Sequence, residues 1–158
     1  MGRIRDRLGE LKLELPDPPV APPGVELPFE WVRVSGQYAY ISGHGPWNGS
    51  DVLVRGKVGT EVSPERAEEA ARLTALSMLA SLERELGDLE RVTGWVKALG
   101  LVNCAPAFTG MPAVINGFSN LVIDLWGEPG RHARSAIGAA ELPFEMSVEV
   151  EAIVEVEV

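Results

Sequence analysis

The C-terminal stretch from Val148 to Val158 constrains the fold more strongly than any other part of this chain. Apolar residues alternate there with mostly acidic ones. One set of alternate positions holds Val148, Val150, Ala152, Val154, Val156 and Val158. The other set holds Glu149, Glu151, Ile153, Glu155 and Glu157. Because successive side chains of a strand point to opposite faces, this pattern predicts a β-strand.

A second strand is predicted just before it. The segment Ala133–Glu141 is small and apolar apart from Arg134 and the final glutamate, and Pro143, which cannot donate to a ladder, marks a break after it. We therefore expect the chain to end in a hairpin of two neighbouring strands. Arg134 and Glu149 on such strands would hold a small polar substrate between them.

The middle of the chain predicts two helices with a strand between them. Ser63 and Gly87 mark the ends of the first helix, as an N-cap and as a left-handed residue after the last turn. A buried strand over Val92–Asn103 and a second helix over about Met111–Leu125 follow from the apolar pattern.

Shorter elements are predicted in the N-terminal part. Trp31–Val34 and Gln37–Ser42 form strands around a turn, and Asp51–Val58 forms a small hairpin arm. Residues 3–11 have the spacing of a short amphipathic helix, and the proline-rich residues 16–24 form an extended tether. We divide the chain into residues 1–28, the N-terminal helix and tether, and the domain 29–158.

Composition narrows the classes of function. The chain of 158 residues is 46% hydrophobic and 23% charged, as expected for one globular domain. Its net charge of −9 disfavours nucleic-acid binding, which normally requires a basic surface. A single cysteine excludes an internal disulfide framework. The absence of an apolar membrane span or secretory signal makes a cytoplasmic location our expectation.

Several motifs resemble the YjgF family, also called the RidA or reactive-intermediate deaminase family, from about Phe29 to the C-terminus. The family's early strand and loop match Tyr40-Ile41-Ser42-Gly43, and its helix motif matches Val114-Ile115-Asn116-Gly117. The most specific block combines Ala133-Arg134-Ser135-Ala136, Leu142-Pro143 and Val148-Glu149-Val150-Glu151-Ala152-Ile153. The chain is most similar to a longer branch with an N-terminal extension.

The resemblance implies a chorismate-mutase-like α+β fold, in which a mixed sheet is packed by two helices. It also implies a homotrimer around a central barrel, with sites in the clefts between subunits. Family members hydrolyse enamines and imines such as 2-aminoacrylate to 2-keto acids and ammonia, as 2-iminobutanoate/2-iminopropanoate deaminases, without a metal or cofactor. Other members are described as endoribonucleases or translation inhibitors.

Two residues match the family's catalytic positions. Arg134 matches the arginine that grips the substrate carboxylate, and a guanidinium offers two parallel donors to such a group. Glu149 matches the glutamate that positions or activates the attacking water. The alternatives are a structural salt bridge at a trimer interface for Arg134 and a solvated strand face for Glu149.

Five further residues match substrate-binding positions. Ser42 and Gly43 match a loop whose backbone contacts substrate, and Asn116 matches a helix asparagine near the site. Phe29 stands where other members have a tyrosine, so its role would be limited to shape and stacking. His44 stands in the loop where the family often has glutamine, and would bond substrate or act in proton transfer. The structural alternatives are turn formation for Ser42, Gly43 and His44, and a helix–helix hydrogen bond for Asn116.

Three functions remain open on this sequence. The first is the imine deaminase, the second a non-catalytic trimer that binds small carboxylates, and the third a ribonuclease. We expect a small-molecule carboxylate as partner, and neither a membrane nor nucleic acid. The two histidines without a third ligand predict no metal site.

Overall fold

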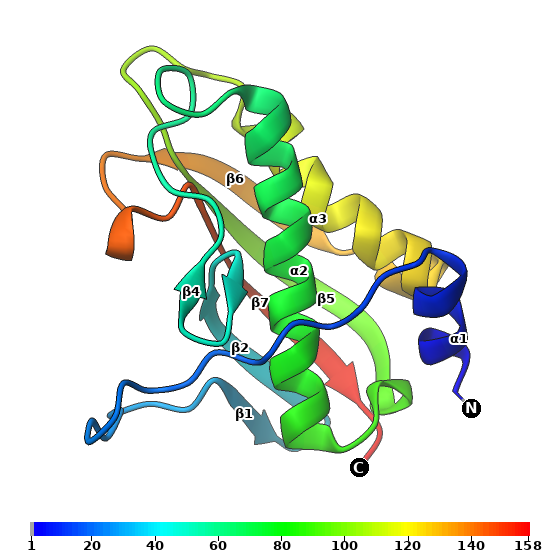
Figure 1. Ribbon diagram of the computed structural model, residues 1–158. Coiled ribbons are helices and arrows are strands. Elements are labelled where there is room, and N and C mark those ends of the chain that lie inside the picture. Colours follow the sequence, from blue (N-terminus) through cyan, green and yellow to red (C-terminus); the bar gives the residue numbers. More distant parts are fainter. Residues whose placement is uncertain (1) are drawn as a thin grey trace.

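The computed structural model describes residues 2–158 and has the α+β class predicted from the sequence (Figure 1). Its helices are α1 (Arg3–Glu10), α2 (Pro64–Leu86) and α3 (Met111–Trp126). Its strands are β1 (Val32–Ser35), β2 (Tyr38–His44), β3 (Trp47–Asn48), β4 (Asp51–Val52), β5 (Val92–Asn103), β6 (Ala133–Ala139) and β7 (Val148–Val156). Short 3-10 turns lie at Leu89–Arg91, Glu128–Gly130 and Pro143–Glu145.

One mixed sheet holds the larger strands, in the order β1-β2-β7-β5-β6. Strands β5 and β6 run parallel, whereas the other neighbouring pairs are antiparallel. Strands β3 and β4 form a separate two-stranded hairpin. With α2 and α3 packed on it, this sheet confirms the chorismate-mutase-like arrangement that the resemblance implied.

The predicted final hairpin is wrong, because β6 and β7 are not neighbours. Strand β5 lies between them, with Ala98 opposite Arg134 on one side and Leu101 opposite Glu149 on the other. The chain between β6 and β7 therefore crosses the end of β5 instead of turning tightly. Strand β5 has 12 residues and a mostly apolar sequence, so it takes the interior of the sheet. Alternation predicts a strand and its faces but does not identify its neighbours.

The small hairpin arm lies earlier than predicted. Trp47 pairs with Val52 around a two-residue turn in which Gly49 has a φ of +60°. A glycine at the first central position suits the turn types that match the twist of two antiparallel strands. Arg55 and Val58, which fall in the predicted arm, instead form isolated bridges, Arg55 to Met146 and Val58 to Val62 and Cys104.

Helix α2 has the ends that its sequence predicts. The Ser63 side chain accepts a hydrogen bond of 3.1 Å from the backbone N–H of Arg66, which satisfies a free donor of the first turn. Gly87 ends the helix with a φ of +81°, and its N–H donates to the carbonyl of Glu83 at 2.8 Å.

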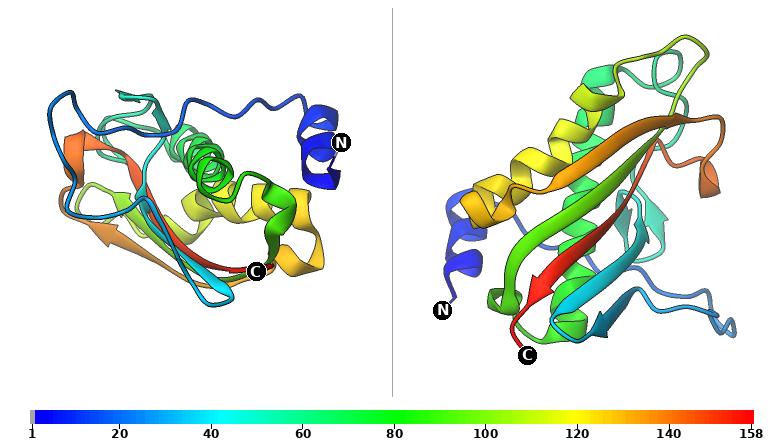
Figure 2. Two further views of the ribbon diagram at one scale, coloured as in Figure 1. Left: turned by 90° about the horizontal axis from the view of Figure 1, so that it is seen from below. Right: turned by 180° about the vertical axis from the view of Figure 1, so that it is seen from behind.

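Helices α2 and α3 cover one face of the sheet and bury the even-numbered residues of β7 (Figure 2). They approach each other closely at Gly117, where an added Cβ would lie 2.0 Å from the carbonyl oxygen of Glu68. Within residues 2–158 no helix covers the opposite side, which we call the open face. The open face includes Arg33, Tyr40, Ser42, Lys97, Leu99, Ser135, Glu151 and Ile153, which line a groove of about 560 Å³.

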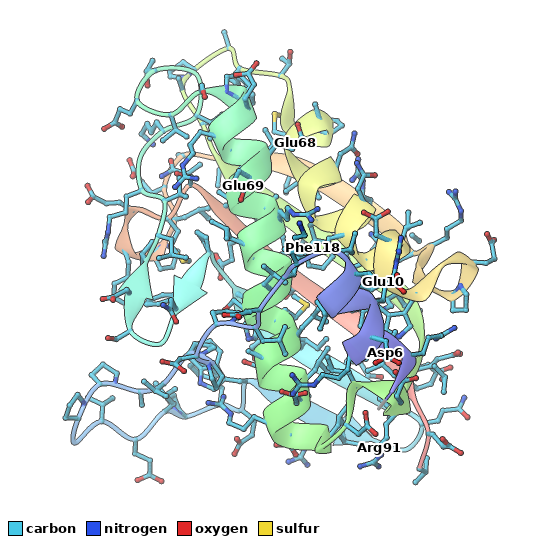
Figure 3. All side chains as sticks on the ribbon, turned by 45° about the vertical axis from the view of Figure 1, so that its right-hand side comes forward. Asp6, Glu10, Glu68, Glu69, Arg91 and Phe118 are labelled. Carbon is cyan, nitrogen blue, oxygen red and sulfur yellow. The ribbon has the colours of Figure 1, made fainter. Side chains whose placement is uncertain are left out.

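The N-terminal segment lies over the helices (Figure 1). Ile4 and Leu8 of α1 are buried in the main core, while the acidic side chains of Asp6 and Glu10 remain exposed (Figure 3). The tether then crosses α2, where Arg84 donates to the carbonyl of Pro19 at 3.0 Å. The segment is thus held to the domain through α1 and at Pro19.

Candidate functional site

Arg134 lies on the edge strand β6, and its side chain points toward α3. Its guanidinium donates to Ser119 Oγ at 2.9 Å, to Asn116 Oδ1 at 2.8 Å and to the carbonyl of Pro112 at 3.1 Å. These three acceptors come from the first nine residues of α3 and carry no charge. They fix the plane of the guanidinium without neutralising it.

Arg134 has no acidic partner in the part of the chain that the structure describes. The ion pairs found there are Arg5–Glu83, Arg7–Glu10, Lys57–Glu141 and Arg131–Glu128. Arg134 therefore forms no salt bridge within residues 2–158, and the alternative role, a salt bridge at a trimer interface, involves a second copy of the chain. A partly buried, unneutralised cation in a fixed plane is suited to bind an anion, and a carboxylate in particular.

A second side chain supports Arg134 through Ser119. His132 Nε2 lies 2.9 Å from Ser119 Oγ, and its Nδ1 lies 2.8 Å from the carbonyl oxygen of Gly130. Because a carbonyl only accepts, Nδ1 carries the proton, and the neutral ring accepts from the Ser119 hydroxyl. Burial and, to a lesser degree, the charge of Arg134 lower the pKa of His132, while the bond to Gly130 opposes this shift.

Glu149 lies on β7 and shares the open face with Glu151. Its carboxyl group is about half buried, and this desolvation, followed by the charge of Glu151, raises its pKa above the usual value. One carboxylate oxygen lies directly over Gly43 on β2, where an added Cβ would be only 2.2 Å from Oε1. The glycine is therefore required for Glu149 to adopt this position.

Ser42 and Phe29 lie near the same end of β2. Ser42 Oγ donates to the carbonyl of Glu30 at 2.7 Å, and its backbone N–H donates to the carbonyl of Trp31 at 3.0 Å. The ring of Phe29 packs edge-on against Trp31, with centroids 5.4 Å apart, and is largely exposed. These contacts join the end of the tether to the Ser42–Gly43 backbone.

His44 is fully buried on the helix-covered side of the sheet, between β2 and α2. Its Nδ1 lies 2.6 Å from the carbonyl oxygen of Ser42 and its Nε2 lies 2.8 Å from Ser81 Oγ. Burial is the main cause that lowers its pKa to about 4, so the ring is neutral at pH 7. This environment favours a structural role for His44 over direct contact with a substrate.

The structure brings the predicted site residues together in two groups. The arginine group contains Arg134 and Asn116, with Ser119 and His132 as further members. The glutamate group contains Phe29, Ser42, Gly43 and Glu149. Helical spacing was the signal for Ser119, which follows Asn116 by three residues and so shares its face of α3.

The two groups do not meet within one chain. Arg134 points to the helix-covered face, whereas Glu149 lies on the open face, and β5 separates their strands. Two strand spacings place their backbones about 10 Å or more apart. One small substrate therefore cannot contact both side chains of the same chain.

Neither a metal cluster nor a membrane span is present in residues 2–158. No three histidine, cysteine or acidic side chains are grouped so that they could hold a metal ion. None of the described helices combines the length and apolar character needed to cross a bilayer.

The fold is a chorismate-mutase-like α+β domain, with the arginine group on the helix-covered face of its sheet and the glutamate group on the open face. The family model described as "YjgF/chorismate_mutase-like, putative endoribonuclease" matches residues 5–156. The chain therefore belongs to this family, which confirms the YjgF/RidA resemblance of the sequence motifs.

Three relatives extend over nearly the whole chain. Protein TCP17 of Trypanosoma cruzi is 37% identical over 155 residues, covering 98% of this chain and 94% of that protein. The crystal structure of a protein of unknown function from Agrobacterium tumefaciens is 40% identical, with a TM-score of 0.89 and coverage of 98% and 93%. A protein from Shewanella oneidensis, which carries the same endoribonuclease description, is 26% identical, with a TM-score of 0.88 and coverage of 97% and 99%.

Proposed function

We propose that this protein hydrolyses reactive enamines and imines of 2-amino acids to 2-keto acids and ammonia, at sites shared between copies of the chain. The observation that carries the proposal is the guanidinium of Arg134, which is held by three neutral acceptors and has no ion pair within residues 2–158. Such a group binds the carboxylate that all these substrates share. In a desolvated cleft the pair contributes roughly a few kcal/mol.

Glu149 provides the proton transfers that the hydrolysis needs. An enamine such as 2-aminoacrylate first tautomerises to 2-iminopropanoate. Water then adds to the imine carbon to form a carbinolamine, and cleavage of the carbon–nitrogen bond releases ammonia and pyruvate. A carboxylate takes a proton from the water and returns one to the nitrogen, and the raised pKa of Glu149 suits it to both steps.

The opposite placement of Arg134 and Glu149 supports a site between two copies. Arg134 of one copy would bind the carboxylate, and Glu149 of the next would face the imine carbon. The open face supports this assembly, because Tyr40 and Ile137 are nearly half exposed there. We therefore propose a homotrimer in which the open faces line a central barrel.

The test is the release of keto acid and ammonia from imines that an amino-acid oxidase generates in situ from several amino acids. We expect the wild type to accelerate release, and Arg134→Ala to lower kcat/KM about 100-fold because the carboxylate loses its partner. Arg131→Ala is the matched control, since Arg131 is exposed and its one ion pair within residues 2–158 is with Glu128. No acceleration by the folded wild type with any amino acid would contradict the proposal.

The alternative is a trimer that binds small carboxylates without turnover, because the Arg134 environment fits both functions. Glu149→Gln separates them. We expect it to abolish turnover while it leaves keto-acid affinity within about twofold of the wild type, measured by calorimetry.

The endoribonuclease description of relatives is tested by measuring RNA binding at low salt. We expect no binding, because the chain has 23 acidic and 14 basic residues.

A further inference from the structure

His44 lies on the helix-covered side of β2, whereas the Glu149 carboxylate lies over Gly43 of the same strand on the open face. The His44 ring contacts neither the open face nor solvent. Its side chain is fully buried, and its ring packs edge-on against Trp31 with centroids 5.3 Å apart. A histidine buried at this point needs partners for both ring nitrogens.

Both partners are present and they determine the tautomer. Nδ1 lies 2.6 Å from the Ser42 carbonyl oxygen, which can only accept, so Nδ1 carries the proton. Nε2 lies 2.8 Å from Ser81 Oγ, and in the neutral ring it accepts from that hydroxyl. The ring thereby connects the backbone of β2 to helix α2.

The carbonyl that His44 binds belongs to an irregular part of β2. The pairing of β2 with β7 shifts between Ile41 and His44, so Ser42 and Gly43 lie in a bulge. The other polar groups of Ser42 are also bound, because its N–H and Oγ donate to the carbonyls of Trp31 and Glu30. Gly43, in the same bulge, lies beneath the Glu149 carboxylate.

We propose that His44 is a positioning residue for Glu149, because it holds the Ser42 carbonyl and so fixes the bulge that supports the Glu149 carboxylate. This inference rests on the proposed function, in which Glu149 acts on the imine. Without the His44 donor, the Ser42 carbonyl would lose its partner and the bulge would relax. The carboxylate of Glu149 would then gain water and lose its fixed place.

The test is the titration of Glu149 by NMR, with the side-chain carboxyl carbon of glutamate labelled and the signal assigned from Glu149→Gln. In folded His44→Leu we expect the pKa of Glu149 to move down toward that of an exposed glutamate. His44→Gln should keep the wild-type pKa, because its amide offers a donor to Ser42 and an acceptor to Ser81. Thr74→Val, which removes another buried hydroxyl of α2 that bonds only locally to the Ala70 carbonyl, is the matched control and should not move it.

Turnover provides a second readout. We expect His44→Leu to lower kcat about tenfold with KM changed less than about twofold, because Arg134 still binds the carboxylate.

The titration needs no substrate, so it separates the two proposals. A shifted pKa of Glu149 without deaminase activity would support the positioning role and contradict the proposed function. An unchanged pKa in folded His44→Leu would overturn the positioning role. If that variant does not fold, Ser81→Ala decides instead, with a downward shift expected and no shift contradicting the inference.

Discussion

The carboxylate of Glu149 occupies the space that a side chain at residue 43 would fill. In Gly43→Ala the added Cβ would lie 2.2 Å from Oε1, so the carboxylate must move. Because the end of a flexible side chain can move at little cost, we expect the free energy of unfolding to change by less than about 1 kcal/mol. We expect kcat to fall about tenfold or more, since Glu149 leaves its place.

Gly9→Ala in α1 is the matched control for this change, because nothing lies within 4 Å of the added Cβ. It should leave kcat unchanged and stabilise slightly, as alanine favours a helix over glycine. Steady-state kinetics and urea unfolding of both variants check the pair. A kcat in Gly43→Ala equal to that of the wild type would show that the position of Glu149 does not matter.

The buried ring of His44 makes stability depend on pH in a defined window. Its pKa is about 4 in the folded chain and 6.5 when unfolded, so between these values the unfolded chain binds more protons. Stability from this residue is therefore complete above pH 6.5 and falls as the pH drops to 4. The expected loss is about 3 kcal/mol.

Urea unfolding of the wild type and of His44→Gln between pH 4 and 7 measures this contribution by difference. Carboxylates titrate in both proteins, so their effect cancels. We expect the difference in the free energy of unfolding to change with pH in favour of the wild type as the pH rises. Equal pH slopes for the two proteins would show that His44 is not buried in its neutral form.

The sequence predicts which residues form the site better than it predicts what each of their side chains contacts. The motifs single out Arg134 and Glu149, and the structure fixes the Arg134 guanidinium by hydrogen bonds and raises the pKa of Glu149 by desolvation. The motifs also place His44 in a loop that binds substrate, whereas its ring points inward to Ser81. The shift in pairing at the β2 bulge decides this direction, and bulges carry no clear signal in one sequence.

At the scale of elements, the α2–α3 contact depends on a glycine that no side chain can replace. A Cβ at Gly117 would lie 2.0 Å from a backbone oxygen of α2, which cannot rotate away. We expect Gly117→Ala to lower the free energy of unfolding by about 2–3 kcal/mol, because the helices must separate. Urea unfolding tests this, with Gly9→Ala again as the control. A stability within about 0.5 kcal/mol of the wild type would contradict the close packing.

The N-terminal helix contributes to the core through Ile4, whose side chain is fully buried. We expect Ile4→Ala to lower the free energy of unfolding by about 2–4 kcal/mol, through lost burial and the cavity left behind. Val20→Ala, in the exposed part of the tether, should change it by less than about 0.5 kcal/mol. Similar values for both variants would mean that α1 is not part of the folded domain.

Local signals predict elements, but not their neighbours. Ser63 and Gly87 predict the ends of α2 because capping depends on residues that are close in sequence. The pairing of β5 with both β6 and β7 depends on contacts between distant segments, and the sequence alternation of β7 is compatible with any partner. The mistaken final hairpin arose from this difference between local and long-range information.

At the scale of the whole molecule, the two groups of site residues lie on opposite faces of one sheet. Each group is internally well ordered, with hydrogen bonds around Arg134 and close packing around Glu149. If both act on one substrate, each site must take its arginine from one copy and its glutamate from another. The resemblance to the family implied such shared sites, whereas the spacing of the residues in the sequence does not predict them.

The most direct test of this shared site is complementation between two inactive variants. Arg134→Ala and Glu149→Gln are co-expressed with different tags, and assemblies that carry both tags are purified and assayed for imine hydrolysis. In a trimer that carries both tags, one of the three shared sites has both side chains intact, so we predict activity of about a third of the wild type. Mixed assemblies as inactive as each variant alone, beside an active wild type, would contradict a site built from two copies.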